Sequence, residues 1–455
     1  GLGLVLRGPA SPPAHLGVAG APRFARDLPA GPFRARIQPW LEIRALLPLV
    51  TVTARRTTAV RRDGSGKGRV ALDLYDDVWV EGSSGAVAGG WAVEVAELAG
   101  YPKDARKARA LLASLGLEPA AGLLESAQAL TGVDPRGFQG SPTVRLGAGE
   151  PALEAFRRVF ANLAATMEAN RQGTVDDIDP EFLHDLRVAV RRTRSVLAQG
   201  RRVLPVAVRD RYREEFGWLG GATGPARDLD VYVIEWEGYV APLGRDGAAA
   251  LGPVLDHVVA RRRAEHDALN RALDSPRHHT LVASWDAWLR AGEVEGAGPE
   301  AGRPIGRVAA DRVARAQAQV LARGRSIDAG TPAEVLHELR KDAKKLRYLL
   351  ECFGGLYDPR PLKAFVQRLK ALQDNLGEHQ DAEVHAAQLR DMATELHGRA
   401  GVGPDTIFAM GRLTEHLEER RQAARDEFAE RFSGYDTKPT ARALEDLLAS
   451  DRARS

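Results

Sequence analysis

The chain has 455 residues, of which 44% are hydrophobic and 27% charged, and its 64 Lys and Arg against 61 Asp and Glu leave a formal net charge of +3. This length allows two or three domains that each bury a core, and the composition is that of an ordinary soluble protein. The single cysteine, Cys352, excludes a disulfide framework and a cysteine-based metal cluster, and it favours a reducing, cytoplasmic setting.

The termini and the apolar runs carry little targeting information. No apolar run reaches the length of a membrane span, so we expect no membrane partner. The first residues are too short and too interrupted for a signal peptide. They begin with Gly1 rather than Met, so we expect the chain to be a fragment.

Residues 1–118 are predicted to form a small α+β domain with antiparallel strands. Alternating or β-branched runs predict short strands over 33–38, 49–58, 69–74, 78–80 and 91–98. The segment 101–115 then predicts one amphipathic helix that ends before Gly116. Residues 119–149, which include GVDPRGFQGSPT, are predicted to be a linker.

From Pro151 onward the periodicity is almost entirely helical, so the chain is predicted to be mainly α. A first set of helices is predicted over 151–172, 179–202, 206–220, 226–240, 248–273 and 279–290. After a break at 293–304, a second set covers 305–323, 332–353, 361–377, 379–397 and 404–432, with a tail helix at 441–449. The stretches GWLGGATGP and DNLGEHQ predict a corresponding bend in each set. We therefore predict two pseudo-symmetric bundles of at least four helices, at 150–292 and 293–435, followed by a tail at 436–455.

Two segments of these helices repeat each other. FLHDLRVAVRRTR at 182–194 aligns without a gap with VLHELRKDAKKLR at 335–347 when the sequence is shifted by 153 residues. The shift places His184, Arg187, Arg191, Arg192 and Arg194 on His337, Arg340, Lys344, Lys345 and Arg347, and it also places Gly224 on Gly377 and Asp228 on Asp381. An internal duplication explains this most simply.

The repeated helix carries a basic stripe beside its apolar face. His184, Arg187, Arg191 and Arg194 fall within an arc of about 80° on a helical wheel, next to the face formed by Leu183, Leu186, Val190 and Leu197. Between Arg187 and Arg202 there are six Arg and no acid. Cations at the edge of a helix–helix groove suit a phosphate ligand, because guanidinium groups donate in pairs to phosphate oxygens. A solvated charged face, with Arg stems covering the core, and packed core histidines are the alternatives.

Asp228 and Asp381 also have two interpretations. They could orient the Arg and His side chains, or they could serve as helix caps or intramolecular ion-pair partners. Either role is supporting, and neither requires contact with a ligand.

The two stripes and the segment GPARDLDV resemble the CHAD family over about 150–435. The resemblance implies two four-helix bundles around a central basic channel that binds inorganic polyphosphate. It implies ligand contacts from His184, Arg187, Arg191 and Arg194 and from His337, Arg340, Lys344 and Arg347, with Arg192 and Lys345 as additions. No catalytic residue and no cofactor are implied.

The segment before the bundles resembles the rear part of a CYTH domain, the triphosphate-tunnel family. The stretches RALLPLVTVTARRTTAV, RVALDLYDDV and WAVEVAEL follow the order of its later strands. The metal-binding ExExK strand of these enzymes is absent from the chain, and Glu94 and Glu97, three residues apart, do not share a strand face. We therefore expect no metal site and no catalysis here, with Mg or Mn required only if this part is active. Arg55, Arg56 and Arg61 are candidates for secondary phosphate contacts.

These observations predict a non-catalytic polyphosphate-binding protein in the cytoplasm, where association with polyphosphate granules is also expected. The alternatives are a metal-dependent triphosphatase, a nucleic-acid binder and a protein-interaction scaffold. Aromatic residues total 6%, and none interleaves with the basic face of 182–194 to stack bases, so nucleic acid is the weaker choice. A bound polyanion should raise the pKa values of His184 and His337, which predicts tighter binding as pH falls from about 8 to 6.

Overall fold

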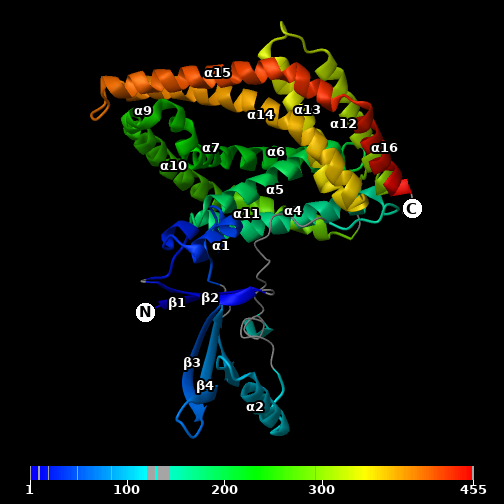
Figure 1. Ribbon diagram of the computed structural model, residues 1–455. Helices are drawn as coiled ribbons and strands as arrows, with labels where there is room; N and C mark the ends of the chain where they lie inside the picture. Colours follow the sequence, from blue (N-terminus) through cyan, green and yellow to red (C-terminus); the bar gives the residue numbers. More distant parts are fainter. Residues whose placement is uncertain are drawn as a thin grey trace. The chain divides into compact units, whose positions relative to one another are not determined.

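The computed structural model describes residues 2–8, 11–18, 20–48, 50–82, 85–119, 129–131, 144–292 and 294–452. The chain divides into two compact units, Gly1–Gln139 and Gly140–Ser455 (Figure 1). The first holds a small antiparallel three-stranded sheet, and the second is helical, so the chain is mainly α as the sequence predicts. Most of the predicted linker at 119–149 lies outside the described residues.

The first unit contains two antiparallel arrangements of strands. Strands β1 (Leu2–Gly8) and β2 (Ser11–Val18) pair as a hairpin. Strands β3 (Thr51–Arg62), β4 (Gly68–Gly82) and β5 (Gly85–Glu97) form a meander in the order β3-β4-β5. Helix α2 (Pro102–Ser114) follows β5, as the amphipathic pattern predicts.

Two predictions for this unit are wrong. The expected strand at 33–38 is helix α1 (Pro32–Leu41), because Pro32 is placed in the first helical turn and Phe33, Ile37 and Leu41 recur every four residues. The expected strands at 69–74 and 78–80 form the single strand β4, which passes an irregularity of register where Asp77 adopts a positive φ of 51°. The β1–β2 hairpin carries no strong strand signal and is not predicted.

The helical unit begins with a first set of eight α-helices. In chain order these are α4 (Ala152–Val175), α5 (Pro180–Gln199), α6 (Val206–Ala222), α7 (Gly224–Ile234), α8 (Trp236–Val240), α9 (Gly244–Ala250), α10 (Gly252–Leu273) and α11 (Pro276–Arg290). The helices expected over 226–240 and 248–273 are therefore each divided, at Glu235 and Leu251.

The second set consists of fewer and longer helices. They are α12 (Ile305–Arg325), α13 (Ala333–Cys352), α14 (Pro359–Leu396), α15 (Pro404–Tyr435) and α16 (Lys438–Arg452). Figure 1 shows α14 as one continuous helix beside α15. The two helices predicted over 361–377 and 379–397 are therefore one helix, because a single Gly377 costs a helix only about 1 kcal/mol. In the first set, Gly220, Gly221, Gly224 and Pro225 lie at the equivalent place. The helix is interrupted there at Thr223, between α6 and α7.

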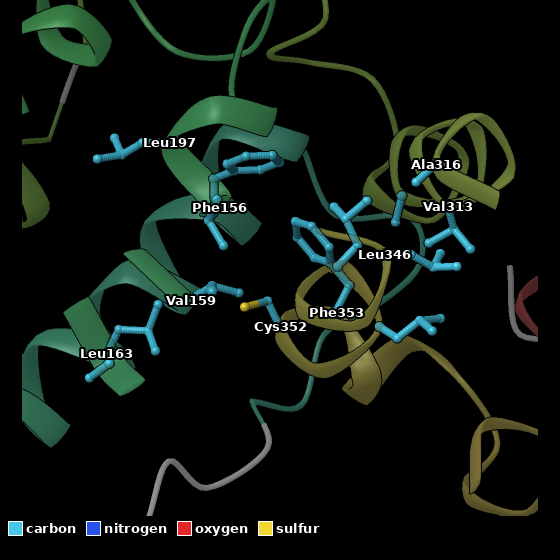
Figure 2. Packing of buried hydrophobic residues seen from close by; sticks show 14 of the residues in the cluster. Phe156, Val159, Leu163, Leu197, Val313, Ala316, Leu346, Cys352 and Phe353 are labelled. Atoms are coloured by element: carbon cyan, nitrogen blue, oxygen red, sulfur yellow. The ribbon is translucent and has the colours of Figure 1, made fainter. Parts of the chain in front are cut away.

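One apolar core joins the two sets of helices. Phe156 of α4 packs against Phe353, the residue after α13, with ring centroids 5.3 Å apart. Figure 2 shows this pair together with Cys352, which points toward Val159. A second core, around Tyr232 and Leu389, fills the space between α7, α8, α10, α14 and α15.

The segments that lead into α4 and α12 are bonded to each other. The amide of Ala152 donates to the carbonyl oxygen of Arg303 (2.9 Å), and the amide of Ile305 donates to that of Glu150 (2.8 Å). A shift of 153 residues converts one of these bonds into the other. The bonds from Leu153 to Ala301 and from Gly306 to Ala148, both 2.9 Å, are related in the same way. Equivalent helices consequently lie together, α4 beside α12 and α5 beside α13.

Candidate anion-binding groove

Helices α5 and α13, which carry the basic stripes, form where the sequence predicts them. Asp179 caps α5 by accepting a hydrogen bond from the Glu181 amide (2.9 Å), and Pro180 starts the helix. The predicted apolar faces are confirmed, because Leu183, Leu186, Val190 and Leu197 are buried on α5 and Leu336, Leu339, Leu346 and Leu350 on α13. Burying one face of each helix fixes which way the neighbouring basic stripe points.

Arg191 and Lys344 lie at the centre of the candidate site. The two residues are counterparts in the repeat, and both line two adjoining hollows. The wider hollow, of about 870 Å³, lies between α5, α6 and α13, and the narrower hollow, of about 660 Å³, lies between α5, α13 and α14. We call the two hollows together the central groove.

The repeat also relates the two hollows to each other. Arg194, Ser195 and Ala198 of the wider hollow are the counterparts of Arg347, Tyr348 and Glu351 of the narrower one. Glu338, Lys341 and Lys345 likewise correspond to Asp185, Val188 and Arg192. Each half of the repeat thus supplies the same positions to a different hollow, and Arg191 and Lys344 lie where the hollows meet.

The two hollows differ in charge. Six cations and four carboxylates line the wider hollow, whereas five cations and five carboxylates line the narrower one. In the narrower hollow Glu351 pairs with Arg192 (2.8 Å) and with Arg347 (2.6 Å). The counterpart of Glu351 in the repeat is Ala198, so Glu351 neutralises arginines in the narrower hollow and no equivalent acid does so in the wider one. An anion would therefore meet more unbalanced positive charge in the wider hollow.

Arg187 and Arg340 make equivalent ion pairs in the two halves. Arg187 lies 3.6 Å from Asp228, and Arg340 lies 2.9 Å from Asp381. Both carboxylates are exposed, at 62% and 60%, so each pair leaves its acid accessible to water. The structure thus places Asp228 and Asp381 against the arginines that the sequence associates with them.

The junction between α6 and α7 is shaped around Arg187. A guanidinium nitrogen of Arg187 donates to the carbonyl oxygen of Gly220 (3.1 Å), and a Cβ at Gly224 would lie 3.0 Å from the same nitrogen. Glycine at 224 therefore permits the close approach of this side chain. Burial lowers the pKa of Arg187, whose side chain is 21% exposed.

Lys344 is held among like charges. Burial, followed by the positive charges of Arg340 and Arg191, lowers the pKa of Lys344 to about 8. The Nε atoms of Arg191 and Arg340 are buried and have no hydrogen-bond partner within the described part of the chain. Buried donors without acceptors are costly, and an anion at this position would supply acceptors and negative charge together.

The remaining predicted residues lie at or near the central groove. His184 lines the narrower hollow, and His337 is exposed and hydrogen-bonded through Nδ1 to Gln380. Arg194 and Lys345 are exposed side chains of the wider hollow. Several lining residues escape the sequence prediction, namely Arg213, Lys341, Tyr348 and Glu351. Glu351 carries a usable signal, because it lies four residues after Arg347 on the same helix.

The sheet residues singled out from sequence belong to the other unit and are mostly paired. Arg55 bonds to Asp76 (2.9 Å) and Arg56 to the buried Asp73 (2.7 Å), whereas Arg61 is exposed. Glu94 accepts a hydrogen bond from the Tyr75 hydroxyl (3.1 Å), and Glu97 lies 4.0 Å from Arg109. Throughout the described residues of the chain, no group of three or more His, Cys, Asp or Glu is arranged to hold a metal ion.

Membrane insertion through a helix finds no support in the structure. Within the ranges that the structure describes, every helix is too short or too polar to cross a bilayer.

Replacing Lys344 with Met should stabilise the unliganded protein. Because the Lys344 pKa is lower in the folded than in the unfolded chain, the unfolded state binds more protons between about pH 8 and 10, and the charged form opposes folding below pH 8. We expect the free energy of unfolding at pH 7 to rise by about 1–2 kcal/mol, and the gain to shrink toward pH 10. Denaturant unfolding of Lys344→Met at both pH values, with the exposed neighbour Lys345→Met as control, measures this. A variant less stable than the wild type at pH 7 would contradict it.

The fold and the site define a helical protein with an internal repeat and a groove at the junction of the two repeats. Nine cations and nine carboxylates line this groove, and Arg191 and Lys344 lie at its centre. The CHAD domain family model matches residues 157–390, more than half of the chain. The chain therefore belongs to the CHAD domain family, which is associated with polyphosphate binding.

The individual proteins that the chain resembles share about a quarter of the aligned residues with it. Two uncharacterized proteins of Mycobacterium tuberculosis, from strains CDC 1551 / Oshkosh and ATCC 25618 / H37Rv, are each 26% identical over 286 residues, which is 62% of this chain and 53% of theirs. The chain thus spans about half the length of the curated relatives it matches. Among solved structures, the CHAD domain from the plant Ricinus communis is 26% identical with a TM-score of 0.49, covering 68% of this chain and 96% of that one. PptA from Streptomyces chartreusis is 22% identical with a TM-score of 0.48, covering 62% and 99%.

Proposed function

We propose that the central groove binds inorganic polyphosphate without altering it chemically. The observation that carries the proposal is the gathering of Arg191, Arg340 and Lys344, with the Lys344 pKa lowered to about 8 and two buried guanidinium Nε atoms lacking partners. A linear chain of phosphates would supply acceptors to all three residues along a groove that is open rather than closed.

The halves of the helical unit, in this proposal, are four-helix bundles at 150–292 and 293–435 related by a pseudo-two-fold axis, with a tail at 436–455. The reciprocal hydrogen bonds of Ala152 and Ile305 and the equivalent ion pairs of Arg187 and Arg340 support this arrangement. In two-fold contacts, equivalent groups meet each other in this way. A groove with two equivalent halves suits inorganic polyphosphate, because the two ends of that polymer are chemically identical.

Nucleic acid fits the groove less well. Nucleic-acid strands have a direction, and proteins that bind single strands commonly stack bases on aromatic side chains. Among the described residues that line the central groove, Tyr348 is the one Phe, Trp or Tyr, and His184 is the one histidine. We therefore assign the groove to a phosphate polymer without bases.

We also propose that residues 1–118 are a partial CYTH-like domain without catalytic activity. The support is a meander of three antiparallel strands followed by a helix, together with the lack of an ExExK motif in the sequence. With Arg55 and Arg56 engaged by carboxylates, Arg61 is the candidate here for a secondary phosphate contact. A metal-dependent triphosphatase is the alternative, and it would release phosphate from tripolyphosphate in the presence of Mg²⁺ or Mn²⁺.

A competition experiment tests the function. Labelled long-chain polyphosphate is displaced by unlabelled polyphosphate, RNA, DNA or ATP, and each affinity is measured at several salt concentrations. We expect polyphosphate to compete at least about tenfold better than either nucleic acid, and its affinity to fall steeply with salt because counterions are released. Equal competition by RNA would favour nucleic-acid binding, and an affinity that barely changes with salt would contradict an electrostatic groove.

A further inference from the structure

We propose that the bound polyphosphate chain continues out of the central groove at one end only, into a third hollow against α12. This inference rests on the proposed function. The third hollow, which we call the α12 hollow, measures about 480 Å³ and is lined by Arg201, Arg202, Arg312 and Arg315. None of these four residues belongs to the repeated basic stripes.

The α12 hollow is continuous with the wider hollow of the central groove. Ala198 and Gln199 at the end of α5, and Asp342 and Lys345 of α13, line both. Lys345 is exposed and lines both hollows, so a ligand in either hollow would meet its positive charge. A chain that passes Arg191 and Lys344 would enter the α12 hollow without leaving the cationic surface.

The α12 hollow has the largest imbalance of charge of the three. Five cations and two carboxylates line it, compared with five and five in the narrower hollow at the opposite end. Both carboxylates are already engaged. Glu300 pairs with Arg202 (3.0 Å) and Arg312 (3.2 Å), and Asp342 pairs with Arg323 (2.7 Å).

Arg201 and Arg315 are the charges that this pairing leaves available. Both side chains are exposed, and neither forms a salt bridge with any residue that the structure describes. Burial lowers the pKa of Arg312, and the positive charge of nearby Arg315 acts in the same direction. Like charges held close together without enough carboxylates are stabilised by an added anion.

The repeat shows that this extension exists at one end only. The counterparts of Arg201, Arg202, Arg312 and Arg315 in the other half are Gly354, Gly355, Val159 and Asn162. None of these carries a charge, and a Cβ at Gly355 would collide with the carbonyl oxygen of Val144. The duplicated stripes thus build a groove with two similar ends, and the four arginines make one end more cationic. Short chains would occupy the central groove, whereas long chains would also reach the α12 hollow.

The double substitution Arg201→Gln/Arg315→Gln tests this, with long-chain polyphosphate and tripolyphosphate as the two probes. We expect the affinity for the long chain to fall about tenfold or more, and the slope of log affinity against log salt to decrease by about 1.4 for two lost contacts. The affinity for tripolyphosphate should not change. The control is Arg263→Gln/Arg271→Gln on α10, which removes two exposed charges that line none of the three hollows and should change neither affinity.

The outcomes separate this inference from the proposed function. If the wild type binds both probes and the double variant binds the long chain as tightly as the wild type does, the extension into the α12 hollow is wrong. Binding in the central groove would then still be supported. An equal loss for both probes also overturns the extension, because it would show a general electrostatic effect on the centre. If the wild type binds neither probe, the proposed function itself fails. Because both arginines are exposed, the variant should fold, and the single Arg315→Gln variant gives the same comparison if it does not.

Discussion

Reversing the charge of Arg191 and Lys344 together should abolish polyphosphate binding, with a loss of about 1,000-fold or more in affinity. These two residues line both hollows of the central groove, so each change removes a cation from both sides at once. The new glutamates would lie near Arg187 and Arg340 and could form ion pairs with these arginines. Their carboxylates would then take the place of the ligand's phosphate groups. The fold should therefore survive the substitution.

Titration calorimetry of Arg191→Glu/Lys344→Glu against long-chain polyphosphate measures the loss. The matched control is Arg263→Glu/Arg271→Glu, which makes the same change in net charge on exposed positions of α10. We expect the control to retain affinity within a few fold, since well-separated surface charges are screened at physiological salt. Equal losses in the two variants would mean that overall charge, and not the groove, holds the ligand.

The second expected result is a fall in affinity above pH 8 that depends on Lys344. The ligand's negative charge favours the ammonium form, so binding should raise the Lys344 pKa from about 8 and take up protons. Below pH 8 the Lys344 side chain is already charged in the free protein, so Lys344 should contribute no change of affinity with pH there. Above pH 8 it should weaken by up to about tenfold per pH unit until the pKa of the bound state is reached.

The variant Lys344→Arg is the control, because its guanidinium keeps its charge throughout this range. Calorimetry in two buffers of different ionisation enthalpy should show proton uptake near pH 8.5 in the wild type and none in Lys344→Arg. The same slope in both proteins would rule out Lys344 as the titrating group. His184→Gln/His337→Gln tests the separate expectation of tighter binding between pH 8 and 6, since that part of the slope should disappear without changing the fall above pH 8.

Together with the stability experiment, this result would explain why a lysine lies at the junction of the hollows. Burial and two arginines make its charge unfavourable in the unliganded protein, so Met at this position should be more stable. The same unfavourable charge makes the site receptive to an anion. Stability and affinity should therefore change in opposite directions at position 344.

Much of the helical unit follows from the sequence alone. The spacing of Leu183, Leu186 and Val190 predicts both α5 and its buried face, and the shift of 153 residues predicts that α13 repeats it. Arg191 and Lys344 are predicted as equivalent positions for the same reason. These features depend on residues three or four apart, or on a direct alignment, so they can be found without knowing how helices pack.

Where local signals compete, the sequence is less decisive. Phe33 and Ile37 fit a short strand as well as a helix, and Pro32 favours the helix of α1. Gly377 predicts the end of one helix and the start of another, but α14 continues through it because its helical hydrogen bonds outweigh the cost of a single glycine. In the first set, in contrast, Gly220, Gly221 and Gly224 lie close together, and α6 and α7 are separated at Thr223 because Pro225 removes a helical donor.

The balance of charge in the groove is decided by the tertiary structure. Glu351 neutralises Arg192 across the contact between α13 and α5, and no pattern within either helix indicates that this pair will form. Arg312 and Arg315 reach the α12 hollow only because α12 packs beside α13. Helical periodicity is set by neighbours along the chain. The electrostatic field at the groove is instead summed over charges that distant segments bring together, and it depends on their separations and on how far they are buried, which only the packing decides.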